Sequence, residues 1–184
     1  MTLTKTPICN FGEKAKDFNL LSTENKKISL DNVKGKNGTL IMFICNHCPY
    51  VKAVIRDIVG DAKYLETLGI KSAAIMSNDV KNYPEDSFEN MISFSKTHNF
   101  TFPYLIDETQ EVAKEFGAVC TPDFFGYNKK LELQYRGRIR ELKNLKPAGK
   151  EDSDLNIAMK LIATSEKGPK NQISSMGCNI KWFK

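Results

Sequence analysis

A buried strand that runs through a pair of cysteines into an amphipathic helix constrains this chain more than any other feature. Residues 38–44, GTLIMFI, form an almost continuous apolar run, which is typical of a central strand covered on both faces. From about residue 48 to residue 68 the apolar residues recur at helical spacing, so we predict a helix there. The sequence Cys45-Asn46-His47-Cys48 therefore places two thiols where a strand ends and a helix begins.

The remaining pattern alternates strands with helices, which predicts one α/β domain. Two short extended segments, 18–21 and 27–30, predict an N-terminal β-hairpin. Further strands are expected at 70–76, 104–106, 123–127 and 131–135, the last two joined by a turn at 128–130. Further helices are expected around 88–92, at 112–116 and at 155–163. Asp107 and Gln110 look like a capping pair for the second of these, and Gly117 ends it.

Length and composition fit one soluble globular domain. The chain has 184 residues, 41% hydrophobic and 27% charged. Its longest apolar run, 40–45, is far short of the roughly 20 residues that a membrane helix needs. Residues 1–10 contain no apolar h-region, so we expect no secretory signal and a cytoplasmic location. We divide the chain into an arm at 1–11, a domain at 12–165 and a tail at 166–184 that packs on the domain.

The net charge of +5 is unevenly distributed. Residues 129–184 hold 13 Lys and Arg against 6 Asp and Glu, a net +7, whereas the rest holds 14 against 16, a net −2. A basic third can bind nucleic acid or an acidic partner. Because the basic residues lack the aromatic interleaving of single-strand binders, we expect a solvated surface and neither a nucleic-acid nor a membrane partner.

The thiols at the strand–helix junction are predicted to be reactive. Five cysteines occur, at positions 9, 45, 48, 120 and 178. In a reducing compartment, cysteines are more often catalytic, metal-binding or inert than cross-linked. A helix N-terminus carries about half a positive charge and unpaired N–H groups, which stabilise a thiolate. A second cysteine one turn away can then resolve the mixed disulfide. Pro49 suits a first helical turn, and a protonated His47 would stabilise the thiolate further.

The remaining cysteines allow more than one interpretation. Cys120 begins the motif Cys120-Thr121-Pro122-Asp123, whose proline marks either an ordinary turn or a cis peptide that shapes a site. Cys178 lies in an apolar cluster at 176–183, where it either docks over the site as a third thiol or merely packs. In the second case Trp182 and Phe183 would anchor the tail.

Two further residues are expected to have no part in chemistry. Cys9 has no partner in the sequence pattern and is expected to be inert. His98 follows a helical segment and is expected to be a surface or C-cap residue.

Four separated motifs resemble the redoxin, or AhpC/TSA-type, branch of the thioredoxin fold, which includes the peroxiredoxins. Residues 12–20, GEKAKDFNL, resemble the opening of that branch, and LIMFICNHCPY resembles its active-site strand and loop. The stretches FICNHCPYVKA, GAVCTPDFFGY, YRGRI and SMGCNIKW resemble a peroxiredoxin-like thiol–disulfide oxidoreductase subgroup. The resemblance spans residues 12–182 and implies a thioredoxin-like fold, with a central mixed β-sheet flanked by helices and a C-terminal tail.

The resemblance also implies roles for residues of the site. Cys45 matches the attacking nucleophile of a thioredoxin-type pair, and Cys48 matches its resolving partner. The supporting positions are Asn46, His47, Pro49, Thr121 and Pro122, with a cis peptide expected before the last. The implied function is a cytosolic thiol–disulfide oxidoreductase without cofactor or metal. Its substrate would be a protein or small-molecule disulfide, and a thiol reductant would reset it.

Three other functions stay open. In the peroxiredoxin register Cys48, which Pro49 follows, is the peroxide-reactive thiol. The resolving thiol would then be Cys178, Cys120 or Cys45, and the stabilising arginine would be Arg136 or Arg138. A zinc or iron–sulfur site would draw on Cys45, His47, Cys48, Cys120 and Cys178. A binding module would use the basic C-terminal third. Whether the chain forms a homodimer stays open as well.

Overall fold

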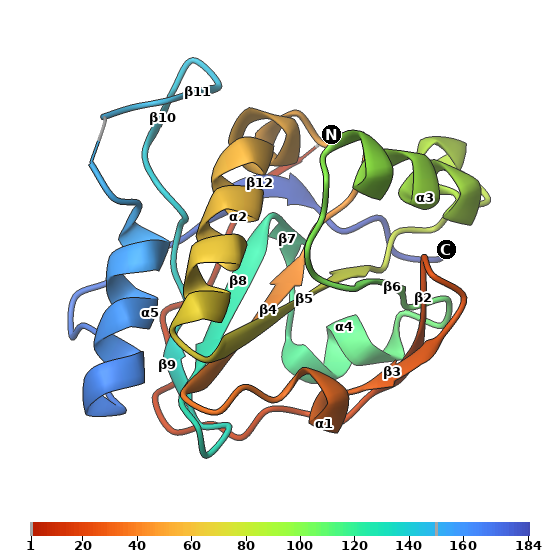
Figure 1. Ribbon diagram of the computed structural model, residues 1–184. Coiled ribbons are helices and arrows are strands. Elements are labelled where there is room, and N and C mark those ends of the chain that lie inside the picture. The colour runs from red at the N-terminus through yellow and green to blue at the C-terminus, as the bar shows by residue number, and fades with distance from the viewer. Residues whose placement is uncertain (1, 150) are drawn as a thin grey trace.

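A seven-stranded mixed β-sheet forms the centre of the computed structural model, which describes residues 2–149 and 151–184 (Figure 1). Its strands are β2 (Asn19–Ser22), β3 (Lys27–Ser29), β4 (Gly38–Phe43), β5 (Ile70–Met76), β6 (Tyr104–Ile106), β8 (Asp123–Tyr127) and β9 (Leu133–Tyr135). Their order is β3-β2-β6-β5-β4-β8-β9. β5 pairs in parallel with β4 and β6, and the other neighbours pair antiparallel. This is the fold class that the sequence predicts.

Helices cover both faces of this sheet. They are α1 (Leu30–Val33), α2 (Pro49–Thr67), the 3-10 turn η1 (Pro84–Asp86), α3 (Phe88–Thr97), α4 (Glu111–Phe116) and α5 (Asp154–Ser165). The buried residues of α2, α3 and α5 pack on one face, and those of α1 and α4 pack on the other (Figure 1). Along β4, Leu40 and Met42 join the first group whereas Ile41 and Phe43 join the second. Every residue of β4 is buried, which explains its continuously apolar sequence.

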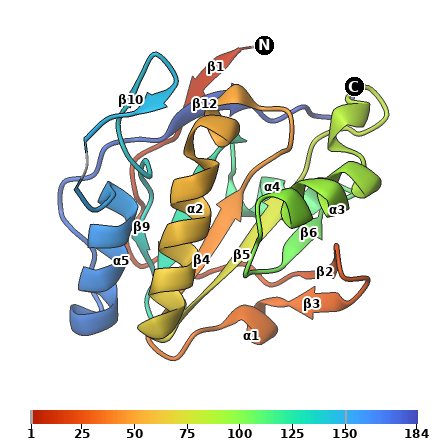
Figure 2. The ribbon, with the colours of Figure 1, turned by 45° about the horizontal axis from the view of Figure 1, so that its top comes forward.

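A second, three-stranded antiparallel sheet joins the two ends of the chain. Its strands are β1 (Leu3–Lys5), β12 (Met176–Asn179) and β7 (Cys120–Thr121), with β12 in the middle. Figure 2 shows β1 and β12 side by side near the N-terminal end of α2. A short hairpin of β10 (Leu142–Lys143) and β11 (Lys146–Pro147) stands apart from both sheets.

The predicted strands and helices are confirmed with small shifts at their ends. The N-terminal hairpin is β2–β3, and the helix expected over residues 48–68 is α2. His98 is the C-cap of α3, as expected. No helix in the described part of the chain has both the length and the apolar character that a bilayer crossing requires.

Of the capping pair predicted at Asp107 and Gln110, only Asp107 caps α4 with its side chain. Gln110 is itself the N-cap of α4, in a left-handed conformation with φ of 64°. The Asp107 carboxylate reaches past it and accepts hydrogen bonds from the Ala113 backbone N–H at 2.9 Å and the Ser77 hydroxyl at 2.9 Å. The Gln110 amide instead donates to the Ser77 and Lys181 carbonyls, both at 2.8 Å. Asp107 therefore provides the local cap, whereas the Gln110 side chain makes a tertiary contact with the tail.

Candidate redox site

Three cysteines converge at the N-terminal end of α2. Cys48 is the N-cap of this 19-residue helix, and Pro49 occupies its first turn. Cys45 precedes it in the turn after β4, and Cys178 lies in β12. The Cys48 and Cys178 sulfurs are 2.9 Å apart. Each of these cysteines is at most 1% exposed, so the thiols are shielded from solvent.

The Thr121-Pro122 loop lies against the same thiols. The cis peptide bond expected between these two residues is present. The Thr121 hydroxyl oxygen is 3.4 Å from the Cys45 sulfur, and the Thr121 carbonyl accepts a hydrogen bond from the Cys48 thiol at 3.2 Å. One residue of this loop thus contacts both cysteines of the C-x-x-C motif.

The C-terminal tail covers the cysteines as a strand. Cys178 pairs with Thr121 in the ladder between β12 and β7. The expectation that Trp182 and Phe183 would anchor the tail is wrong, since these side chains are 37% and 50% exposed. Ile180, which is 1% exposed, is buried instead. Trp182 and Phe183 lie beyond β12, which ends at Asn179, so the pairing of that strand does not hold them against the domain.

The hydrogen bonds among the thiols favour a thiolate on Cys48. The contact with Cys178 lowers the pKa of Cys48 well below its ordinary value of 9.0, and contacts with Cys45 and the Val51 backbone N–H act in the same direction. The contact between Cys45 and Cys48 raises the pKa of Cys45, and burial and the Asp86 charge act in the same direction. Of the two thiols of the C-x-x-C motif, Cys48 is the one at the helix N-cap, and the positive end of the helix also favours its thiolate.

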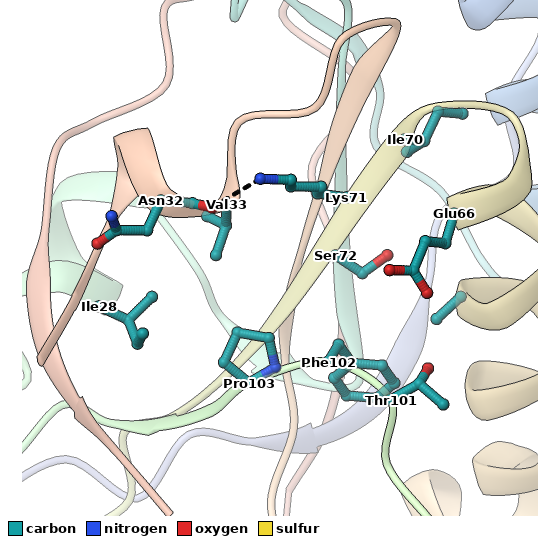
Figure 3. A pocket seen from close by; sticks show the side chains of 11 residues that line it. Ile28, Asn32, Val33, Glu66, Ile70, Lys71, Ser72, Thr101, Phe102 and Pro103 are labelled. Atoms are coloured by element: carbon teal, nitrogen blue, oxygen red, sulfur yellow. Dashed lines mark hydrogen bonds between the residues drawn. The ribbon is translucent and has the colours of Figure 1, made fainter. Parts of the chain in front are cut away.

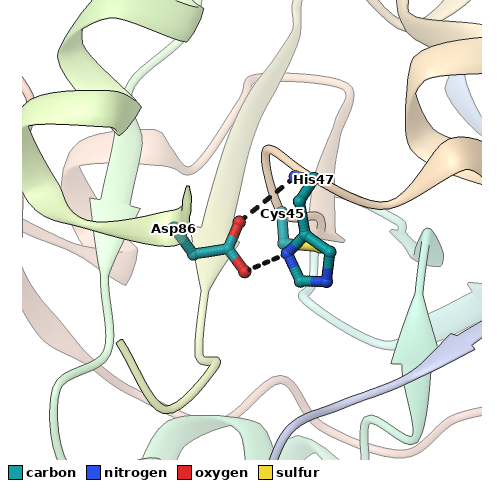
Figure 4. A group of neighbouring side chains, drawn as sticks. All are labelled: Cys45, His47 and Asp86. Carbon is teal, nitrogen blue, oxygen red and sulfur yellow. Dashed lines mark hydrogen bonds and ion pairs between the residues drawn. The ribbon is translucent and has the colours of Figure 1, made fainter. Parts of the chain in front are cut away.

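Asp86, at the end of η1, is the site residue that sequence reasoning missed. Its carboxylate is completely buried. One oxygen accepts hydrogen bonds from the backbone N–H groups of Asn46, at 2.8 Å, and His47, at 3.3 Å. The other lies 2.7 Å from Nδ1 of His47 (Figure 4). It also accepts a hydrogen bond from the Asn78 amide at 2.8 Å. Asp86 is 38 residues beyond Cys48 in a polar loop, so no motif spacing connects the two.

Neighbouring rings hold the same turn from the other sides. The His47 ring stacks on Tyr83, with centroids 5.9 Å apart and an interplanar angle of 7°. The Tyr104 hydroxyl donates to the Asn46 side-chain oxygen at 2.9 Å. Asn46 and His47, which were expected only as supporting residues, are therefore fixed between Asp86 and these two rings.

The donors near Cys45 form a hydrogen-bonded cluster that leaves little room for a metal. Single donor atoms of Cys45, His47 and Asp86 all lie within 4.8 Å of one another (Figure 4). Both Asp86 oxygens already accept two hydrogen bonds, one of them from Nδ1 of His47. A cation needs those lone pairs, so the donor set does not fit one. Within the described residues, the five-ligand set that the sequence left open as an alternative does not assemble, because this cluster lacks Cys48, Cys120 and Cys178.

Burial is the main influence on the two remaining cysteines, Cys120 and Cys9. Cys120 is fully buried and its thiol contacts the Pro122 carbonyl at 3.6 Å. Burial raises the pKa of Cys120, and burial also raises the pKa of Cys9 to about 11. Both thiols are therefore held in the protonated, weakly nucleophilic form.

The arginines considered for a peroxide site bind carboxylates elsewhere. Arg136 pairs with the buried Asp123 at 3.0 Å, and Arg138 pairs with Asp154 at 2.6 Å. Other cations of the basic third are paired in the same way, among them Arg140 with Asp57 at 3.1 Å. These ion pairs offset part of the positive charge that the sequence places in this region.

Two hollows in the surface differ in how close they lie to the reactive cysteines. A cavity of about 180 Å³ lies between α1, the start of β5 and the loop before β6, and no cysteine lines it (Figure 3). A groove of about 460 Å³ is lined by Tyr50, Pro122 and Met176, among others. Pro122 belongs to the loop against the thiols, and Met176 lies two residues before Cys178, so this groove adjoins the redox site.

Comparison with known proteins places the chain in a family. The AhpC/TSA family matches residues 11–142. The crystal structure of an uncharacterized conserved protein from Geobacillus kaustophilus is 37% identical, with a TM-score of 0.94 over 100% of this chain and 97% of that chain. No protein of curated function matches.

More distant structures share the fold. A thiol:disulfide interchange protein of the thioredoxin family from Chlorobium tepidum is 20% identical, with a TM-score of 0.63 over 83% of this chain and 97% of that chain. The peroxidoxin BcpB from Mycobacterium tuberculosis is 16% identical, with a TM-score of 0.56 over 67% of this chain and 81% of that chain. The chain therefore belongs to the AhpC/TSA family, a redox family with the thioredoxin fold.

Proposed function

We propose that this protein is a thiol–disulfide oxidoreductase in which Cys48 is the nucleophile and Cys45 is the second redox thiol. The position of Cys48 carries this proposal. It caps a long helix, its sulfur lies 2.9 Å from that of Cys178, and its contacts with Cys178 and Cys45 lower its pKa. A preformed thiolate is what attack on a disulfide requires.

The reaction follows from the order of the thiols. The Cys48 thiolate attacks one sulfur of a substrate disulfide, forms a mixed disulfide and releases the first substrate thiolate. Cys45 then loses its proton and attacks the Cys48 sulfur. This closes a Cys45–Cys48 disulfide and releases the second substrate thiolate, so two electrons pass to the substrate. A thiol reductant returns them by the reverse exchange.

We propose that His47 accepts the proton that Cys45 loses before it attacks the Cys48 sulfur. A ring nitrogen of His47 lies within 4.8 Å of the Cys45 sulfur, a distance that one water molecule can bridge. Asp86 holds the ring in place through Nδ1. Asp86 is therefore a positioning residue for the second step.

Substitution of each cysteine tests the assignment. Cys48→Ser is expected to lower the rate of reduction of a model disulfide by about three orders of magnitude or more, because removal of a nucleophile abolishes the covalent step. The double variant Cys45→Ser, Cys178→Ser, which removes both thiols next to Cys48, is expected to accumulate the mixed disulfide on Cys48, which intact-protein mass spectrometry detects. Cys9→Ser serves as the control with unchanged activity. A Cys48→Ser protein with the wild-type rate would disprove the proposal.

A second candidate function is that of a thiol peroxidase. The observation that favours it is the lowered pKa of Cys48, which is the thiol that the peroxiredoxin register selects. Peroxide would oxidise Cys48 to a sulfenic acid, and a neighbouring thiol would condense with it and release water. Consumption of hydrogen peroxide at a rate comparable to that of disulfide reduction would favour this candidate. A thiol titre that is unchanged by peroxide would exclude it.

A further inference from the structure

The C-terminal strand occupies the space that an incoming substrate needs. To react with Cys48, a substrate disulfide must bring one sulfur within contact of the Cys48 sulfur. In the structure that place is taken by the sulfur of Cys178, 2.9 Å away. The backbone of β12 also pairs with β7 opposite Thr121, and this pairing uses the strand edge next to the thiols. Cys45 and Cys48 are consequently at most 1% exposed.

Gly177 allows this close approach. A Cβ atom at Gly177 would lie 2.0 Å from the Thr121 carbonyl oxygen and 3.1 Å from the Pro122 nitrogen. Real Cβ atoms essentially never show a contact as short as the first of these, and the obstructing atoms belong to backbone and not to a flexible side chain. Ser175 adds a hydrogen bond from its hydroxyl to the Pro122 carbonyl at 2.7 Å. The fit of β12 against the Thr121-Pro122 loop therefore depends on a residue without a side chain.

The tail is also connected to the C-x-x-C turn by hydrogen bonds. The Lys181 backbone N–H donates to the Asn78 side-chain oxygen at 2.9 Å. The amide group of Asn78 donates in turn to the Asp86 carboxylate, which holds the backbone of Asn46 and His47. A chain of hydrogen bonds through Asn78 and Asp86 therefore connects the tail to the turn that carries the reactive thiols.

We propose that β12 occupies the position at which a substrate binds and that Cys178 is a third redox thiol of the site. The strand leaves β7 to admit a substrate disulfide and returns to form a disulfide with Cys48. The proposal rests on the proposed function in one respect, that Cys48 is the nucleophile.

The exchange balances without any further reactant. The Cys48 thiolate attacks the substrate disulfide, and a mixed disulfide and one substrate thiolate result. Cys178 releases its proton to solvent and attacks the Cys48 sulfur, which forms the Cys48–Cys178 disulfide and frees the second substrate thiolate. The protein loses two electrons and the substrate gains two. Attack by Cys45 on the same sulfur then moves the disulfide to Cys45–Cys48 with no net change in electrons, and this step frees Cys178 and β12.

Gly177→Ala tests the occlusion directly. The probe is iodoacetamide, and the readout is the rate at which Cys48 of the reduced protein is alkylated, followed by peptide mass spectrometry. Because a clash with backbone costs about 1–3 kcal/mol, the variant is expected to open β12 more often and to raise this rate about tenfold. Gly60→Ala is the matched control, since a Cβ there meets nothing within 4 Å and Gly60 lies on the exposed side of α2.

The outcomes of this experiment are distinct. An alkylation rate in folded Gly177→Ala equal to that of Gly60→Ala would overturn the proposal. If Gly177→Ala fails to fold, Ser175→Ala, which removes only the hydrogen bond to Pro122, is expected to raise the rate by a smaller factor. Because no substrate disulfide is present, the experiment is independent of the proposed activity. Faster alkylation without any disulfide reductase activity would support the occlusion and contradict the proposed function.

A disulfide map tests the role of Cys178. Wild-type protein is equilibrated in glutathione buffers of stepped potential, quenched by alkylation and mapped without reduction. A Cys48–Cys178 disulfide is expected alongside Cys45–Cys48, and Cys178→Ser is expected to retain only the second. Detection of Cys45–Cys48 alone in the wild type at every potential would disprove a redox role for Cys178.

Discussion

The two sheets of this protein differ in how they are held together and in what they do. The seven-stranded sheet is covered by helices on both faces, and its central strand β4 is buried throughout. The three-stranded sheet consists of short strands from residues 3–5, 120–121 and 176–179, and it joins segments more than 170 positions apart, such as Leu3 and Cys178. Long-range pairing of short strands offers few buried contacts for the entropy that it costs.

Because of this difference, the stability of the domain depends on the large sheet, whereas access of solvent to the thiols depends on the small sheet. Elements with few buried apolar contacts open locally at a lower free energy than the core does. The small sheet covers the thiols, whereas the large sheet positions α2 and the strand that precedes the C-x-x-C turn. We therefore expect the small sheet to open while the large one stays folded, and the predictions below test this expectation.

Phe124→Ala is expected to have the largest effect on stability. Phe124 is completely buried in β8 of the large sheet. Loss of a buried phenylalanine costs about 3–5 kcal/mol of unfolding free energy, because the transfer term and the cavity term add. Urea denaturation measures this loss. The iodoacetamide reactivity of Cys48 under native conditions is expected to change little, and a large rise in that reactivity would contradict the separation.

Ile180→Ala is expected to lower the unfolding free energy less than Phe124→Ala does and to raise the alkylation rate of Cys48 more. Ile180 is the buried anchor of the tail, next to β12. Its truncation is expected to cost about 2 kcal/mol, at the low end for a buried aliphatic residue, because the tail detaches without unfolding the domain. Alkylation of Cys48 is expected to rise about tenfold or more. If the two variants were equally reactive, the two sheets would open together.

The pH dependence of stability is expected to identify Cys48 as the thiolate. Its folded pKa lies below the unfolded value of 9.0, so the unfolded state binds the additional proton. The stabilisation is then complete above about pH 9 and declines as the pH falls towards the folded pKa, by at most about 1.4 kcal/mol per pH unit. Urea midpoints of wild type and Cys48→Ala between pH 5 and 9 measure this, and parallel profiles would contradict it.

Gly60→Ala is expected to have the smallest effect. Gly60 lies in the middle of α2 and is exposed, with open space around a Cβ. Alanine is expected to raise the unfolding free energy by about 0.5–1 kcal/mol, because it restricts the unfolded chain and favours the helix. Thermal unfolding measures the change. A fall in stability would show that this stretch of α2 is packed more tightly than the structure indicates.

Much of the fold follows from local pattern. The apolar run of β4, the helical spacing of α2 and the turn between them place Cys45 and Cys48 at a strand–helix junction, because backbone hydrogen bonding and burial act over neighbouring residues. The resemblance to redoxins added the fold and the cis peptide before Pro122. The resemblance assigns the attack to Cys45, whereas the order that we propose begins with Cys48 because of the helix end and the thiol contacts that surround its sulfur.

Tertiary structure alone decided what meets these thiols. Asp86 has no spacing or motif that connects it to His47, and three of its four hydrogen bonds arise only when η1 folds against the C-x-x-C turn. Cys178 could be named from the sequence as a candidate, but its contact with Cys48 depends on β12 pairing with both β1 and β7. Local sequence determines periodicity and the residue types available for chemistry. The pKa of a thiol and its access to solvent depend on groups that only the folded chain brings within a few ångströms.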